Sequence, residues 1–218
     1  MKKNADRIEA KLPRHEVWRG LGRNFSDDRE CIASFLALEA AEVIAGIKPG
    51  NLVSVGGRPQ RCGRNLAALW LCHGSGLLKE SGLAAEIVAE QEGTLLLYIY
   101  RPEALERLLV RKSVKVILEK TGYACPVGTD GLFDQLRERM KGGGFPHEIG
   151  IFLGYPLKDV VAFMGWVSLP FACQGPWKIY GNPLESLDLA FRFRECRCRM
   201  ANRLASCVTP FDCLRSAA

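Results

Sequence analysis

The sequence predicts an α+β protein with a small mixed sheet of three to four strands covered by helices. Two apolar runs, 84–91 and 94–101, flank Glu92-Gly93, a pattern typical of a β-hairpin. Helical and strand patterns are mixed without the regular alternation that a doubly wound parallel sheet requires. Apolar residues make up 48% of the chain and charged residues 25%, so 218 residues can form one core.

The first part of the chain contains two predicted helices and one predicted strand. Asp27, followed three residues later by Glu30, indicates the start of a helix that should end near Gly46. Residues 51–55 are predicted to form a short strand, because the run is apolar and ends at two glycines. Residues 64–80 are predicted to form the second helix.

The next segment carries the predicted hairpin and further helices. Its second strand, TLLLYIY, is apolar almost throughout, which predicts a central strand that is buried on both faces. Pro102 ends this strand and begins a helix, where the missing N–H costs nothing. Residues 113–121 and 129–141 are predicted as two more helices. The second has acidic residues early and basic residues late, which suits the helix dipole.

Residues 146–166 form the most distinctive stretch and predict two short helices joined by a tight turn. Pro146 suits a first helical turn, Gly154 ends that helix, and Pro156 begins the next one. The spacing is that of a helix-turn-helix, so DNA binding is one hypothesis. The positions that would face the groove are mostly apolar, and Lys158 alone suits base recognition. The pattern therefore disfavours nucleic acid as a partner.

The last part of the chain is expected to hold one more strand and a long helix. Residues 177–180, WKIY, are predicted as the fourth strand. Asn182-Pro183 begins a helix that should continue to about Leu204. The chain shows no internal repeat and no low-complexity segment.

Three parts are expected along the chain: a flexible arm over 1–25, a single globular domain over 26–206, and a flexible tail over 207–218. The first residues lack the apolar region of a signal peptide, and no run approaches the roughly 20 apolar residues that span a membrane. The nine cysteines are an odd number, which indicates reduced thiols rather than a disulfide framework. We therefore expect a cytoplasmic protein with no membrane span.

His147 and Glu148 are the candidate catalytic residues. The helix dipole disfavours protonation of a histidine in the first turn of a helix. The neutral imidazole is then available as a base, a ligand or a hydrogen-bond donor. No partner for His147 is visible in the sequence, and a structural role is the favoured alternative.

Aromatic residues supply a candidate ligand site. Tyr155, Trp177 and Tyr180, together with Lys178, are the residues expected to line a pocket for a small molecule or planar cofactor. Aromatic residues at strand spacing are more often part of a core, which is the competing interpretation. The identity of any cofactor stays open.

Cysteines supply a candidate metal site. Cys173, Cys196 and Cys198 are the candidate ligands. The spacing is poor, because residues two apart on a helix point about 200° away from one another and the chain has no CxxC pair. Buried thiols that act as small hydrophobic side chains are the alternative.

Several blocks of the sequence resemble a known bacterial family called domain of unknown function 3793. They are FPHEIGIFLGYPLKDVVAFM, the upstream AGIKPGNLVSV and LLLYIYRPEAL, and the downstream GPWKIYGNP and AFRFREC. The similarity covers residues 31–200 in order, although 58–73 and the tail after 204 are unmatched. The resemblance implies a cytoplasmic protein of largely anaerobic bacteria but no mechanism. It also gives weight to the fold boundaries and to His147, Glu148, Gly154, Tyr155, Trp177 and Tyr180.

Three functions remain open from the sequence. The first is a small-molecule, cofactor or metal-handling accessory protein whose pocket lies near His147 and the three aromatic residues. The second is an enzyme that uses His147 with Glu148, and the third is a DNA-binding regulator that uses 146–166. The net charge of +6 and the arginine-rich last helix also permit an acidic partner protein.

Overall fold

The structure, a computed structural model, describes residues 18, 20–59, 63–124, 128–141 and 145–215. The strands are β1 (Gly50–Val55), β2 (Ala84–Gln91), β3 (Thr94–Tyr100), β4 (Phe171–Gln174) and β5 (Lys178–Tyr180). The main helices are α2 (Asp28–Glu39), α3 (Ala41–Ile44), α4 (Leu66–Leu69), α5 (Ser75–Glu80), α6 (Pro102–Leu109), α7 (Lys112–Lys120), α8 (Thr129–Met140), α9 (Ile149–Phe152), α10 (Leu157–Phe163), α11 (Leu184–Ser206) and α12 (Pro210–Arg215). Helices and small antiparallel sheets are combined in one chain, which confirms the α+β class.

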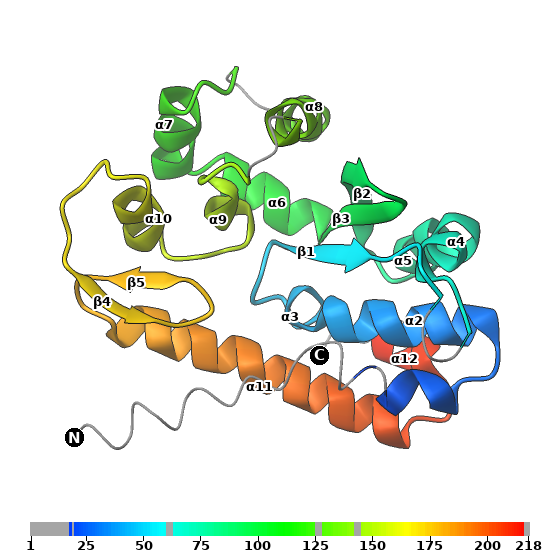
Figure 1. Cartoon of the computed structure of the whole chain (residues 1–218). Helices are drawn as coiled ribbons and strands as arrows, with labels where there is room; N and C mark the ends of the chain where they lie inside the picture. Colours follow the sequence, from blue (N-terminus) through cyan, green and yellow to red (C-terminus); the bar gives the residue numbers. More distant parts are fainter. Residues whose placement is uncertain (1–17, 19, 60–62, 125–127, 142–144, 216–218) are drawn as a thin grey trace.

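The larger sheet has the strand order β1-β3-β2, so β3 is the central strand. Glu92 and Gly93 join β2 to β3 as a two-residue loop, and both have positive φ angles, 50° and 72°. This backbone conformation is the one that a tight hairpin turn needs, which confirms the predicted hairpin. The sheet lies between α2 and α3 on one side and α6 on the other (Figure 1).

Two details of the predicted sheet are wrong. All neighbouring strands run antiparallel, so the sheet is not mixed. The predicted strand at 177–180 does not join it, because the larger sheet consists of β1, β3 and β2 alone among the described residues. Instead, β5 pairs with β4, a strand that the sequence analysis missed, in a separate two-stranded sheet. The short connection after Gln174 lets WKIY find a partner close by in the chain.

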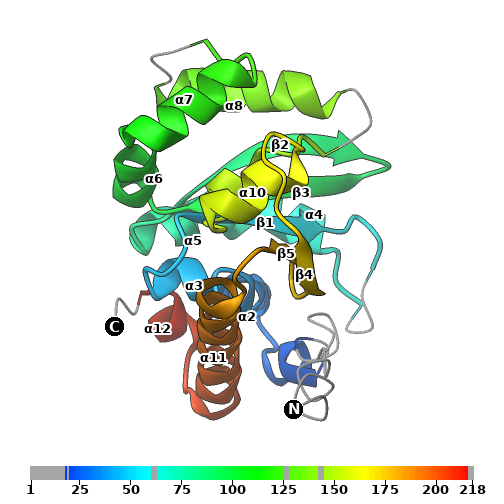
Figure 2. The same ribbon diagram turned by 90° about the vertical axis from the view of Figure 1, so that its left-hand side faces the viewer.

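The central strand β3 is buried on both faces, as its continuous apolar pattern predicted. Leu97 and Ile99 belong to a core formed with α2, α3, α4 and α5. Tyr98 and Tyr100 belong to a second core formed with α6, α7, α8 and α9. The sheet therefore separates two hydrophobic cores; Figure 2 shows α6, α7 and α8 above the sheet and α2 and α3 below it.

Most predicted helices are found close to their expected positions. Two differ: the helix expected from Pro146 begins only at Ile149, so His147 and Glu148 precede it, and the helix expected to end near Gly46 is interrupted at Ala40. Asp27 caps α2, where its carboxylate accepts hydrogen bonds from the N–H groups of Arg29 and Glu30. The helix predicted over 64–80 is continuous but contains a π-helical turn, Trp70–Gly74, between α4 and α5. None of the helices in the described ranges is long and apolar enough to cross a membrane.

The described ends of the chain are packed against α2. Trp18 is buried with its ring edge-on to Phe35, 5.3 Å between centroids. At the other end, α12 contacts α2, and Cys213 and Leu214 are buried there. Residues 210–215 thus differ from the expected flexible tail, because a short apolar face inside the tail is enough to dock it. Residues 1–17 and 216–218 lie outside the described part of the chain.

A buried ion pair connects α3 to α11. Glu42 is fully buried, and its Oε1 accepts hydrogen bonds from the guanidinium of Arg197. The other carboxylate oxygen, Oε2, has no hydrogen-bond partner among the described residues. Because one oxygen of this buried carboxylate accepts no hydrogen bond, the stability of its charge depends strongly on the Arg197 guanidinium.

We expect Arg197→Met to lower the free energy of unfolding by about 3 kcal/mol, because it leaves the Glu42 charge buried and uncompensated. Chemical denaturation measures the loss. The exposed Arg194, on the same helix, is the control, and Arg194→Met should change stability by less than about 0.5 kcal/mol. The double variant with Glu42→Leu should recover much of the loss; equal instability of single and double variants would contradict this role for the ion pair.

Candidate functional site

A cavity of about 280 Å³ lies between α10 and the β4–β5 hairpin. Helix α10 contacts β5 directly, and the hairpin lies beside it in Figure 2. The cavity is lined by Tyr155, Asp159, Val160, Phe163, Gln174, Trp177 and Lys178. Three of the four expected ligand residues, Tyr155, Trp177 and Lys178, are therefore brought together.

Two glycines place Tyr155 at the cavity. Gly154 has a φ angle of 72°, and a Cβ there would lie 2.8 Å from Pro49 Cδ, so the turn after α9 requires glycine. Gly150 lets α9 approach α10 closely, because a Cβ at this position would lie 2.9 Å from Val160 Cγ2. The small residues of the helix-turn-helix pattern thus serve the packing of this turn.

The wall of the cavity is aromatic. The rings of Tyr155 and Trp177 are stacked, with centroids 4.3 Å apart and planes inclined by 20°. The ring of Phe193, from α11, lies 6.0 Å from that of Trp177. Lys48 is buried and holds its ammonium 4.7 Å from the Phe193 ring, while it also donates to Asn51 Oδ1. The wall is thus fixed in place by residues from several elements.

Asp159 is the buried centre of the polar network at the cavity, and it is only 2% exposed. Its Oδ2 accepts hydrogen bonds from Trp177 Nε1 at 2.8 Å and from Ser186 Oγ at 2.6 Å. Its Oδ1 accepts from Lys158 Nζ at 2.8 Å and from the Tyr180 N–H at 2.9 Å. One carboxylate therefore joins α10, β5 and the first turns of α11.

These hydrogen bonds keep Asp159 ionised. Burial raises the pKa of its carboxyl, but the bonds from Lys158, Ser186, Tyr180 and Trp177 outweigh burial, so the pKa lies below its usual 3.8. Lys158 Nζ also donates to the Tyr180 carbonyl at 2.9 Å and bonds Ser186 Oγ at 3.0 Å. The sequence analysis missed both Asp159 and Ser186. Asp159 was missed because it stands beside Lys158 in a first helical turn, where charged residues are usually exposed.

Tyr180, the fourth expected ligand residue, does not line the cavity. Its backbone N–H and carbonyl bind Asp159 and Lys158, and its ring lies edge-on to Phe171, with centroids 6.0 Å apart. Phe163 and Gln174 line the cavity in its place, although neither was singled out from the sequence.

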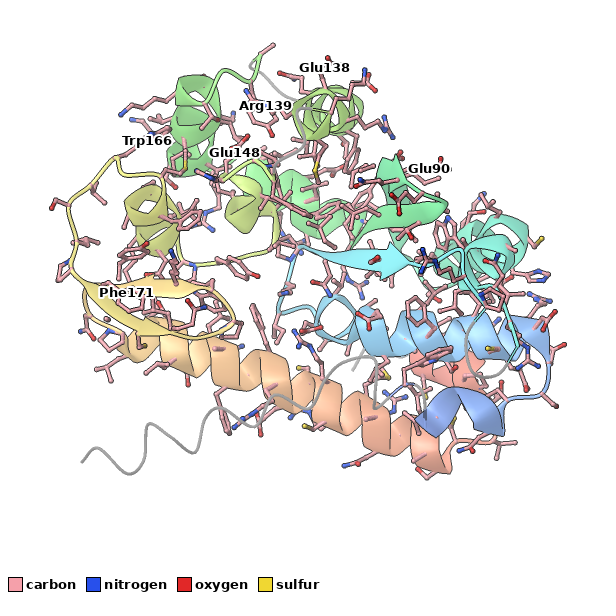
Figure 3. The ribbon with its side chains drawn as sticks, in the orientation of Figure 1. Glu90, Glu138, Arg139, Glu148, Trp166 and Phe171 are labelled. Carbon is pink, nitrogen blue, oxygen red and sulfur yellow. The ribbon has the colours of Figure 1, made fainter. Side chains whose placement is uncertain are left out.

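The two candidate catalytic residues occupy different surroundings. His147 is exposed, and its ring lies edge-on to Phe163 with centroids 4.9 Å apart. Glu148 is buried and forms an ion pair with Arg139 at 3.2 Å; Figure 3 labels both side chains. Burial and the Glu148 carboxylate raise the pKa of Tyr123, which packs under the Arg139 guanidinium. Within the described residues no hydrogen bond joins His147 to Glu148.

The candidate metal ligands are separated. Cys196 is buried beside Arg199, whereas Cys198 is exposed on the other side of α11. Cys173, on β4, packs against the cluster of Trp177 and Phe193. Among the residues that the structure describes, no three histidine, cysteine or acidic side chains are grouped as metal ligands.

The two helices of the helix-turn-helix-like pair are packed into the fold. Helix α9 has only four residues, and α10 packs against β5. Lys158, which alone suited base recognition, is held by Asp159, Ser186 and the Tyr180 carbonyl. The helix-turn-helix spacing is therefore used for packing around the cavity.

We expect Asp159→Asn to lower the free energy of unfolding by about 2–4 kcal/mol, because an amide cannot accept all four hydrogen bonds or balance Lys158. Denaturant titration at pH 7 measures the change. The exposed Asp188, on α11, is the matched control, and Asp188→Asn should be nearly neutral. Equal effects of the two substitutions would contradict the central role of Asp159.

The stability that Asp159 supplies should also depend on pH. Because its folded pKa is lowered, the contribution is present above the unfolded pKa and is lost as pH falls through the folded value. We expect the stability gap between the wild type and Asp159→Asn to stay constant from pH 7 to about pH 5 and to shrink below about pH 4. Denaturant titrations across this range test it, and a gap that widens in acid would show that the sign is wrong.

Comparison with known proteins agrees with the blocks recognised in the sequence. No curated protein and no solved structure shows a significant match to the chain. The family model described as "Protein of unknown function (DUF3793)" matches residues 36–213, which include the cavity, all strands of the two sheets and most of α12. Because this match covers over four-fifths of its length, the chain belongs to the DUF3793 family.

Proposed function

We propose that this protein is a cytoplasmic accessory protein of bacterial metabolism that reversibly binds a small organic molecule in the cavity between α10 and the β4–β5 hairpin. The observation that carries the proposal is the aromatic wall formed by Tyr155, Trp177 and Phe163 beside a polar network that is already complete. Ligand sites typically combine apolar walls with a few well-placed polar groups.

The size of the cavity suits a small metabolite. At about 280 Å³ it lies near the lower end of the roughly 300–1,000 Å³ that is typical of ligand sites. The hydrogen bonds of Asp159 hold α10, β5 and α11 together, so the walls are in place before a ligand arrives. A preformed site loses little conformational entropy on binding.

The other two hypotheses have less support. A metal-handling role would need grouped ligands, and the described residues hold no such group. An enzyme based on His147 and Glu148 would need the two side chains to act together, whereas Glu148 is buried against Arg139. DNA binding would need Lys158 and the outer face of α10 to be available.

A neutral planar probe, 1-naphthamide, tests the site. We expect it to shift the indole N–H signal of Trp177 in ¹H–¹⁵N spectra, because this group lies in the cavity wall. Trp177→Phe identifies that signal among the four tryptophans. Phe163→Ala should weaken binding about threefold to tenfold through loss of a ring contact.

The control is Phe191→Ala, which removes a similarly exposed phenylalanine that is not part of the cavity. It should leave the affinity for 1-naphthamide unchanged. A Trp177 signal that does not move at millimolar probe would count against the proposed function. If the signal does move, mass analysis of small molecules released from protein purified anaerobically from its native host would identify the natural ligand.

A further inference from the structure

The charges that line the cavity do not balance. Asp159 and Lys178 are its acidic and basic lining residues. The Asp159 carboxylate is 2% exposed, and its two oxygens already accept four hydrogen bonds. One of these donors is Lys158, whose ammonium neutralises the carboxylate at 2.8 Å. The negative charge is therefore satisfied within the fold and is not offered to a ligand.

Lys178 is in a different position. It is exposed on β5, and its ammonium lies 5.5 Å from the centroid of the Phe163 ring at the cavity. No acidic side chain in the described ranges forms an ion pair with it. The ammonium therefore adds one positive charge beside the apolar walls of the cavity, and it attracts an opposite charge on a ligand.

A second polar residue, Gln174, is the cross-strand partner of Lys178 in the β4–β5 sheet. Gln174, on β4, lines the same cavity, and its side-chain amide donates one hydrogen bond to the Gly175 carbonyl at 2.8 Å. An amide group carries two N–H donors, so one remains for a ligand. A single ammonium and one amide N–H match the two oxygens of a carboxylate, whereas a phosphate usually has more donors around it.

We propose that the ligand is a planar or aromatic monocarboxylate, that its apolar body packs against Phe163, Trp177 and Tyr155, and that its carboxylate is held by Lys178. This inference rests on the proposed function and adds the class of ligand to it. Lys178 sets the preference for charge, and the aromatic rings hold the body whatever its charge.

Paired probes separate the two parts of the proposal. 1-Naphthoate and 1-naphthamide share their ring system and nearly their shape, but only the first is charged. We expect the wild type to bind 1-naphthoate about tenfold more tightly, followed through the Trp177 indole signal. Lys178→Met should bring the ratio of the two affinities close to one, whereas Lys178→Arg should keep most of the difference.

The controls make each outcome decisive. Lys115→Met removes an exposed lysine on α7 away from the cavity and should not change the ratio of the two affinities. Equal affinities for the two probes, unaffected by Lys178→Met, would overturn the carboxylate assignment and leave the cavity as a neutral-ligand site. Tighter binding of 1-naphthyl phosphate than of 1-naphthoate would overturn it in favour of a phosphate. Failure of all probes to move the Trp177 signal would overturn the proposed function itself.

Discussion

The carboxylate of Asp159 is the constraint on which the arrangement of the site depends. It comes from α10, and it receives the indole N–H of Trp177, the backbone N–H of Tyr180 and the hydroxyl of Ser186. The two-stranded β4–β5 sheet is too small to be stable alone. Anchoring it to α10 and α11 through a buried charge gives it a fixed position and orients Trp177 toward the cavity. Lys158 completes the arrangement, because without a cation the desolvation penalty of the buried carboxylate would exceed the stabilisation from its hydrogen bonds.

The same network shows how a segment with helix-turn-helix spacing is packed in this fold. Gly150 and Gly154 permit a close approach of α9, α10 and the segment around Pro49. In a DNA-binding protein this compactness would present the second helix to the groove. Here α10 packs against the β4–β5 hairpin, and Lys158 donates a hydrogen bond to the buried Asp159 carboxylate. The spacing of the small residues is the same in both kinds of protein, but the residues on the outward face of the second helix differ.

Much of the fold follows from local patterns, and the errors have a common origin. Pro102, Asp27 and the Glu92-Gly93 turn act on their immediate neighbours, so the sequence predicts them well. The pairing of β5 with β4, rather than with the larger sheet, depends on where the chain places this segment in the whole fold, which local patterns do not state. The cavity shows the same division. Tyr155, Trp177 and Lys178 could be selected by residue type, whereas Asp159 becomes a buried centre only through residues that stand 18 to 27 positions away.

The central strand β3 has a further consequence. Its alternate side chains enter two cores that are separated by the sheet, and the cluster of Trp177, Ile179 and Phe193 forms a third. The cavity borders this third cluster through Trp177 and the second core through Val160. The lining residues Phe163, Gln174 and Lys178 belong to none of the three clusters, so substitutions there can change what the protein binds while the cores on either side of β3 stay intact. Relatives with the same helices and sheet would then be expected to diverge first in the hairpin and in the residues that face it.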